Sequence, residues 1–146
     1  MSVVETEAEV RTLHVNKEIQ IAAPIDVVFE TLLSPTGIQV DLNLKLEAWP
    51  GGRWFRDLGN NTGHLWGHVQ VIKPPKLLEI TGPMMMSYPV SSHVQYRLAE
   101  NAGGTLLSVL HRAMGLLDKE HMEGVHKGWL NILESVRDAS QKKASR

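Results

Sequence analysis

The chain has 146 residues, enough for one domain with a core of its own. Fifteen Lys and Arg residues nearly balance sixteen Asp and Glu residues, so the net charge of -1 indicates neither nucleic acid nor an anionic membrane as a partner. The sequence has no cysteine, which excludes disulfides, a thiol nucleophile and thiolate metal ligands.

The first twelve residues are predicted to be a flexible polar tail. This segment contains Glu5, Glu7 and Glu9 and no long apolar run, so it predicts neither a signal peptide nor a membrane span, and we expect a cytoplasmic protein. Apolar and polar residues then alternate from Leu13 to Ile21, which indicates a strand. A helix is expected from Pro24, which suits a first helical position, to the Ser34-Pro35 stop.

The middle of the chain is a series of strand-like segments joined by short turns. The turns contain Pro50-Gly51-Gly52, Gly59 to Gly63 and Asn101 to Gly104, whose lengths favour antiparallel hairpins. Residues 36–43 have no clear pattern. Strands are predicted at residues 44–49, 53–58, 64–73, 77–81, 92–99 and 105–112.

A long helix is predicted from Asp118 to about Ser140. Apolar residues recur there at spacings of three, four and seven, with Trp129 in the middle of the stripe, and Asp118 is a suitable N-cap. Gly124 and Gly128 lie one turn apart inside it, where each costs about 1 kcal/mol relative to alanine. We expect them to make room for a packed strand, with a closely approaching ligand as the alternative.

This order of elements predicts an α+β fold in which a curved antiparallel sheet of about six to seven strands wraps around the long C-terminal helix. That helix is the only element long enough to cover one face of the sheet. A strongly curved sheet around a helix often leaves a hollow, where small ligands bind.

Several short motifs resemble one known superfamily. Residues 67–77 (GHVQVIKPPKL) resemble the G-x-V-x-x-(apolar)-x-P-P-x-x-L signature of START-like helix-grip proteins, in the branch named after an activator of the heat-shock protein ATPase. Ala23-Pro24, Pro50 to Arg53, Gly104 to His111 and Gly128 to Leu133 resemble four further motifs of that branch in the same order.

The resemblance implies a single helix-grip domain at residues 13–142 with an internal cavity. It implies no single activity, because members bind lipids, polyketides or hormones and some catalyse cyclisation. We expect this chain to bind a small apolar or amphipathic molecule. The alternatives are a cyclase- or dehydratase-type enzyme and a co-chaperone-like interaction module.

The inward phase of the strands and of the helix stripe predicts the walls of the cavity. Its ligand-binding residues are expected to be Trp54, Val69, Val71, Tyr96, Val109, His111, Val125 and Trp129. The run Met84, Met85 and Met86 is predicted to lie at the cavity mouth, because methionine is common at adaptable binding surfaces, although the loop would equally fit as local core.

His111 is the candidate catalytic residue, since a neutral imidazole facing the cavity can act as acid or base. An ordinary hydrogen-bonded core histidine is the competing interpretation. His64 and His68 are about 13 Å apart along one strand, too far for one metal ion, and His121 and His126 are five apart on a helix. We therefore expect no metal site and no cofactor.

The last strand raises the question of self-association. If Leu107, Val109 and His111 face inward, then Leu106 and Leu110 face outward by the two-residue period. Isolated exposed leucines are ordinary on protein surfaces. A homodimer that covers them, or the N-terminal segment folded over them, is the competing hypothesis.

Overall fold

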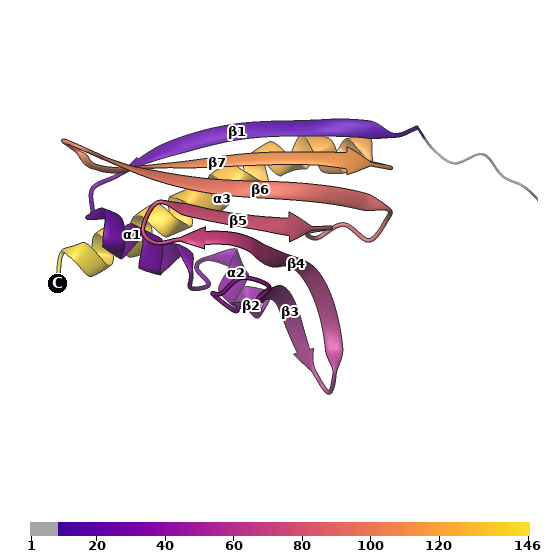
Figure 1. Cartoon of the computed structure of the whole chain (residues 1–146), viewed down its shortest axis with the longest axis horizontal. Coiled ribbons are helices and arrows are strands. Elements are labelled where there is room, and N and C mark those ends of the chain that lie inside the picture. Colours follow the sequence, from indigo (N-terminus) through magenta and orange to yellow (C-terminus); the bar gives the residue numbers. More distant parts are fainter. Residues whose placement is uncertain (1–8) are drawn as a thin grey trace, which may run out of the picture.

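One face of a seven-stranded antiparallel sheet carries a long C-terminal helix (Figure 1). The structure is a computed structural model and describes residues 9–146. In chain order the elements are β1 (Arg11–Ile21), α1 (Ile25–Leu32), α2 (Ile38–Asp41), β2 (Leu44–Leu46), β3 (Arg53–Gly59), β4 (Thr62–Lys73), β5 (Leu77–Gly82), β6 (Val90–Asn101), β7 (Gly104–Gly115) and α3 (Lys119–Ala144). The predicted helix-grip class, with its curved sheet and terminal helix, is confirmed.

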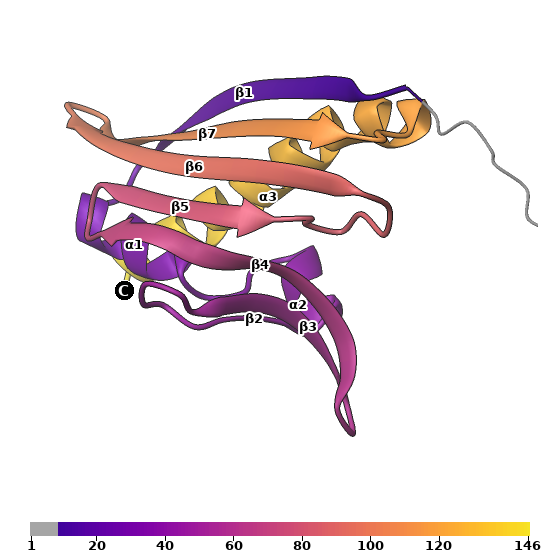
Figure 2. The ribbon, with the colours of Figure 1, turned by 45° about the vertical axis from the view of Figure 1, so that its right-hand side comes forward.

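The strands lie in the order β1-β7-β6-β5-β4-β3-β2, and every neighbouring pair is antiparallel. Strands β2 to β7 therefore follow one another as a meander, and β1 closes the series beside β7. The sheet is curved, and the β3–β4 hairpin extends away from the part that α3 crosses (Figure 2).

Two turns have the geometry that their residues favour. The amide of Gly52 donates to the carbonyl of Trp49 at 2.8 Å, and Gly51 has a φ of +85°, as a type II turn requires at its third residue. Asn60 and Asn61 have φ values of +51° and +59°, which right-handed strand twist favours in a two-residue hairpin turn.

Several element boundaries differ from the expectations: β4, β6, β7 and α3 extend one to four residues beyond their predicted ranges, and four other differences are more specific. β1 begins at Arg11, where it pairs with Gly115, two residues before the predicted start at Leu13. Pro24 is the N-cap of α1 rather than its first helical residue. The unpatterned segment contains the short helix α2, and β2 ends at Leu46 instead of continuing to residue 49. Residues 1–8 of the predicted tail lie outside the described residues.

The core lies between the sheet and the helices. Alternate strand residues such as Val15, Val94 and Val109 are fully buried, and Leu133 of α3 is equally buried against them. Since each such side chain stabilises the fold by about 1.5–3 kcal/mol on burial, this layer holds α3 on the sheet. No helix of the described residues 9–146 is long and apolar enough to cross a membrane.

Helix α3 is also fastened at both of its ends. Asp118 caps it by accepting a hydrogen bond from the amide of Glu120 at 2.9 Å, as predicted. Near the C-terminus, Gln141 accepts from the amide of Ala22 at 3.0 Å, and the Lys143 ammonium donates to the Thr31 hydroxyl at 3.2 Å. The stretch of α3 between these ends packs on β1 and α1.

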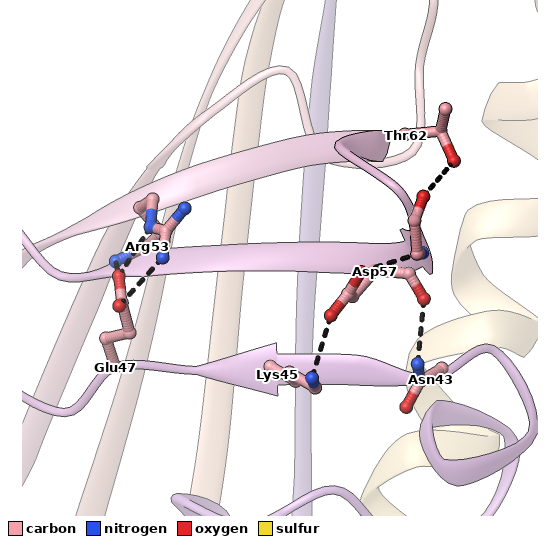
Figure 3. A network of polar contacts seen from close by, with 7 residues as sticks. Asn43, Lys45, Glu47, Arg53, Asp57 and Thr62 are labelled. Carbon is pink, nitrogen blue, oxygen red and sulfur yellow. Dashed lines mark hydrogen bonds and ion pairs between the residues drawn. The ribbon is translucent and has the colours of Figure 1, made fainter.

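Charged side chains hold the β2–β3 edge of the sheet (Figure 3). The Arg53 guanidinium donates to both oxygens of Glu47, at 2.7 and 3.0 Å, and lowers the pKa of that carboxyl to about 2. The Lys45 ammonium lies 2.8 Å from Asp57 and lowers the pKa of that carboxyl also. Because every group is already paired within the edge, these carboxylates have a structural role.

Candidate functional site

A chain of three polar side chains crosses the apolar interior from β6 to α3. The indole Nε1 of Trp129 donates to Nδ1 of His111 at 2.9 Å, and Nε2 of His111 lies 3.0 Å from the hydroxyl oxygen of Ser92. Ser92, His111 and Trp129 are respectively 3%, 2% and 5% exposed. Tyr96 completes the surroundings with an edge-on contact to the Trp129 ring.

The hydrogen bonds fix the protonation of His111. An indole N–H can only donate, so Nδ1 must be the unprotonated nitrogen, and Nε2 carries the proton that it donates to Ser92. Burial lowers the pKa of His111 to about 4, because the interior disfavours the imidazolium. His111 is therefore a neutral imidazole with both nitrogens engaged.

This arrangement limits the chemistry that His111 can perform. In a serine nucleophile pair, the histidine must accept the serine proton through an unprotonated nitrogen. Here the nitrogen that faces Ser92 holds the proton, and Trp129 occupies the opposite nitrogen, where an orienting carboxylate would be needed. No group of three or more His, Asp or Glu residues that could hold a metal ion occurs within residues 9–146.

The structure brings most of the predicted cavity residues together. Buried side chains of the core include Trp54, Val69, Tyr96, Val109, His111 and Trp129, and Val125 is half-buried against them. Val71 is different, because a register shift between Val69 and Val71 pairs Val71 with Glu79, whose side chain lies on the outer face of the sheet. A β-bulge reverses the facing of the residues that follow it, so Ile72 packs against the core in place of Val71.

The hollow beside these residues is small. It measures about 20 Å³ and lies between the α1–β2 segment and the sheet. Its lining includes Trp54 and Tyr96 from the predicted set, together with Leu44, Leu78 and Ile80. That volume is near the space of one water molecule, whereas pockets for small ligands measure about 300–1,000 Å³. In this structure, side chains fill most of the interior.

The methionine run divides between core and surface. Met84 and Met86 are 2% and 3% exposed, whereas Met85 is 49% exposed. The loop therefore packs down onto the core through two of its three methionines. Met84 is held further by its amide, which donates to the carbonyl of Trp66 at 2.8 Å.

Gly124 and Gly128 do not make room for a strand, contrary to the expectation from sequence. A Cβ atom added at either residue would meet nothing within 4 Å. Met122 and Val125, the apolar residues of the same turns, are only half-buried. The part of α3 before Trp129 (residues 119–128) is thus loosely covered, in contrast to the buried residues from Trp129 onward.

Trp66 of β4, an aromatic residue that could line an apolar pocket but is not among the eight predicted ligand-binding residues, is a further candidate. Its side chain is buried in the core and meets the Trp54 ring edge-on, with 5.0 Å between ring centroids. Its indole Nε1 is buried without a hydrogen-bond partner among the described residues. Among the buried side-chain nitrogen and oxygen atoms of residues 9–146, only this atom and the Ser140 hydroxyl oxygen have no hydrogen-bond partner.

Comparison with known proteins gives a consistent result for the fold. The sequence profile of the family described as "Activator of Hsp90 ATPase homolog 1-like protein" matches residues 22–140. The solution structure of an AHSA1-like protein from Rhizobium etli is 28% identical, with a TM-score of 0.65, and the alignment covers 94% of this chain and 87% of that one. A search among curated proteins found no match.

Two further solved structures share the fold at lower identity. A protein from Rhizobium leguminosarum is 17% identical, with a TM-score of 0.72 over 94% of this chain and 99% of its own. The di-domain ARO/CYC StfQ from the steffimycin biosynthetic pathway is 11% identical, with a TM-score of 0.67 over 92% of this chain and 52% of its own. Similarity at these identities concerns the fold and not the activity.

Proposed function

This chain belongs to the family of Activator of Hsp90 ATPase homolog 1-like proteins, and we propose that it binds a small amphipathic molecule between the sheet and α3. The ligand is mostly apolar and carries one hydrogen-bond acceptor, such as a carbonyl or ether oxygen. Trp54, Tyr96 and Trp129 provide the aromatic wall of the site.

The observation that carries this proposal is the unpartnered indole of Trp66. A buried N–H without an acceptor costs about 1–3 kcal/mol, and such groups are rare in folded proteins. The ring of Trp66 contacts Trp54, which lines the interior hollow, and this contact supports a place for the donor near the proposed ligand. An incoming acceptor would remove the cost, while the ring system around it would receive the apolar part of the ligand.

Binding also requires the interior to widen, since the hollow holds only about 20 Å³. The first turns of α3, residues 119–128, are the segment best suited to move. Gly124 and Gly128 face open space there, and Met122 and Val125 are only half-buried. The flexible side chains of Met84 and Met86 can rearrange around a guest at low cost.

The test compares two dyes on two variants. The first dye is Prodan, a naphthalene with a ketone, and the second is the same ring system without the ketone. We expect Trp66→Phe to weaken Prodan binding about fivefold, the loss of one hydrogen bond of about 1 kcal/mol, and to leave the second dye unaffected. Trp49→Phe is the matched control, because Trp49 is 57% exposed. Equal weakening of both dyes by Trp66→Phe would refute the proposed hydrogen bond.

The co-chaperone-like interaction module is a second candidate. It is favoured by the small size of the interior hollow, about 20 Å³, because an interaction module needs a sealed core rather than a ligand cavity. Saturable uptake of the dye would argue against it. The enzyme alternative has less support, because both nitrogens of His111 are engaged and Trp129 occupies the place of an orienting carboxylate.

A further inference from the structure

The outer face of the sheet, opposite α3, carries a row of basic and imidazole side chains that the sequence does not show as a patch. His14 of β1 lies opposite Arg112 of β7, which in turn lies opposite His93 of β6. The row continues through Thr81 to His68. Neighbouring strands are about 4.8 Å apart, so residues from five strands line up although they are scattered between positions 14 and 112.

A groove lies over the β1, β7 and β6 end of this row. It measures about 460 Å³ and is open to solvent. The lining side chains on the outer face are Thr12, His14, Thr81, Ser91, His93, Arg112 and Met114, and the buried residues Leu13, Ser92 and Ala113 complete the lining. The groove is therefore separate from the interior site, with the sheet between them.

The chemistry of this lining is that of an anion site. Arg112 forms no ion pair with any of the residues 9–146, and its guanidinium is always charged. The His14 imidazole and three hydroxyls supply further donors from three strands. The carboxylate of Glu79 accepts from His93 at 2.7 Å and so orients that ring. Arginine is the residue best suited to hold phosphate through two parallel hydrogen bonds.

We propose that this outer-face groove binds a phosphate-bearing small molecule, with Arg112 as the main anchor and His14 and Ser91 as additional donors. Donors on the strands beside β7 flank Arg112, so together they can reach more than one oxygen of a phosphate group. The remaining volume and the exposed side chain of Met114 leave room for the organic part of the ligand.

Titration with glycerol 3-phosphate at constant ionic strength tests this proposal, with amide chemical shifts followed by NMR. We expect saturable shifts at Thr12, His14, Ser91 and Arg112, and none with glycerol alone. Inorganic phosphate should produce the same pattern at higher concentration. Because these probes are polar, they do not report on the interior site, and their failure would leave the proposed function standing.

Arg112→Gln should weaken binding about tenfold, which is the effect of losing one charge-assisted pair. Arg97→Gln is the matched control. Arg97 is on the outer face of the sheet like Arg112, but it lies on β6 and outside the groove. We expect its change to alter the dissociation constant less than twofold. His14→Gln is a second variant, should the arginine change disturb the sheet. Shifts spread over the whole surface, or equal effects of the two arginine changes, would overturn the proposal.

Discussion

The buried His111 makes a specific prediction about the dependence of stability on pH. Its ordinary pKa of 6.5 falls to about 4 in the folded chain, so the unfolded state binds more protons between these values. Stability therefore increases with pH in this window. The contribution of the neutral imidazole is fully present above about pH 6.5 and is lost as the pH falls toward 4. A shift of this size corresponds to about 3 kcal/mol in total and about 2 kcal/mol by pH 5.

The measurement is urea unfolding of the wild type and of His111→Gln at a series of pH values. The chain has seven histidines, so the difference between the two proteins isolates the one that is buried. We expect the variant to be less stable at pH 7, because it disturbs the bonds with Ser92 and Trp129. The gap should close by about 2 kcal/mol at pH 5. A gap that stays constant across this range would show that His111 has the same pKa in the folded and the unfolded chain, as an imidazole exposed to water would, and would refute its assignment as a buried neutral imidazole.

Three further predictions concern α3 and the outer face. Trp129→Ala should destabilise the fold by about 3–5 kcal/mol in chemical denaturation, and a loss under about 1 kcal/mol would contradict its place in the core. Gly124→Ala and Gly128→Ala should each stabilise by up to about 1 kcal/mol, since an added Cβ meets open space at both; lower melting temperatures would contradict this. We also propose that Leu106 and Leu110, half-buried on the outer face, support a homodimer. Sedimentation of wild type against the double lysine variant tests it, and a monomeric wild type at high micromolar concentration would contradict it.

The elements that local sequence determines were predictable. The alternation in β6 and β7, the apolar stripe of α3 and its Asp118 cap all depend on residues close together in the chain. The inward direction of His111 followed from the same two-residue period, and the structure buries it accordingly. The short helix α2 was missed because four residues are too few to show a helical period.

The features that depend on cross-strand register were not predictable. The bulge between Val69 and Val71 gives no signal in sequence, yet it reverses the facing of Val71. The contact of Ser92 with His111 requires the β6–β7 register, and the alignment of His14 with Arg112 requires the pairing of the first strand with the last. The open space at Gly124 depends on how closely α3 approaches its neighbours, which periodicity does not specify.

Native mass spectrometry of gently purified protein tests the proposed function most directly. If the interior between the sheet and α3 binds an amphipathic molecule, the wild type should carry a small molecule of constant added mass, and the Trp66→Phe variant should carry less of it. The released molecule should contain an acceptor oxygen on an apolar body. A bare-chain mass in every charge state, together with no saturable uptake of Prodan, would contradict the account and leave the sealed interaction module as the better description.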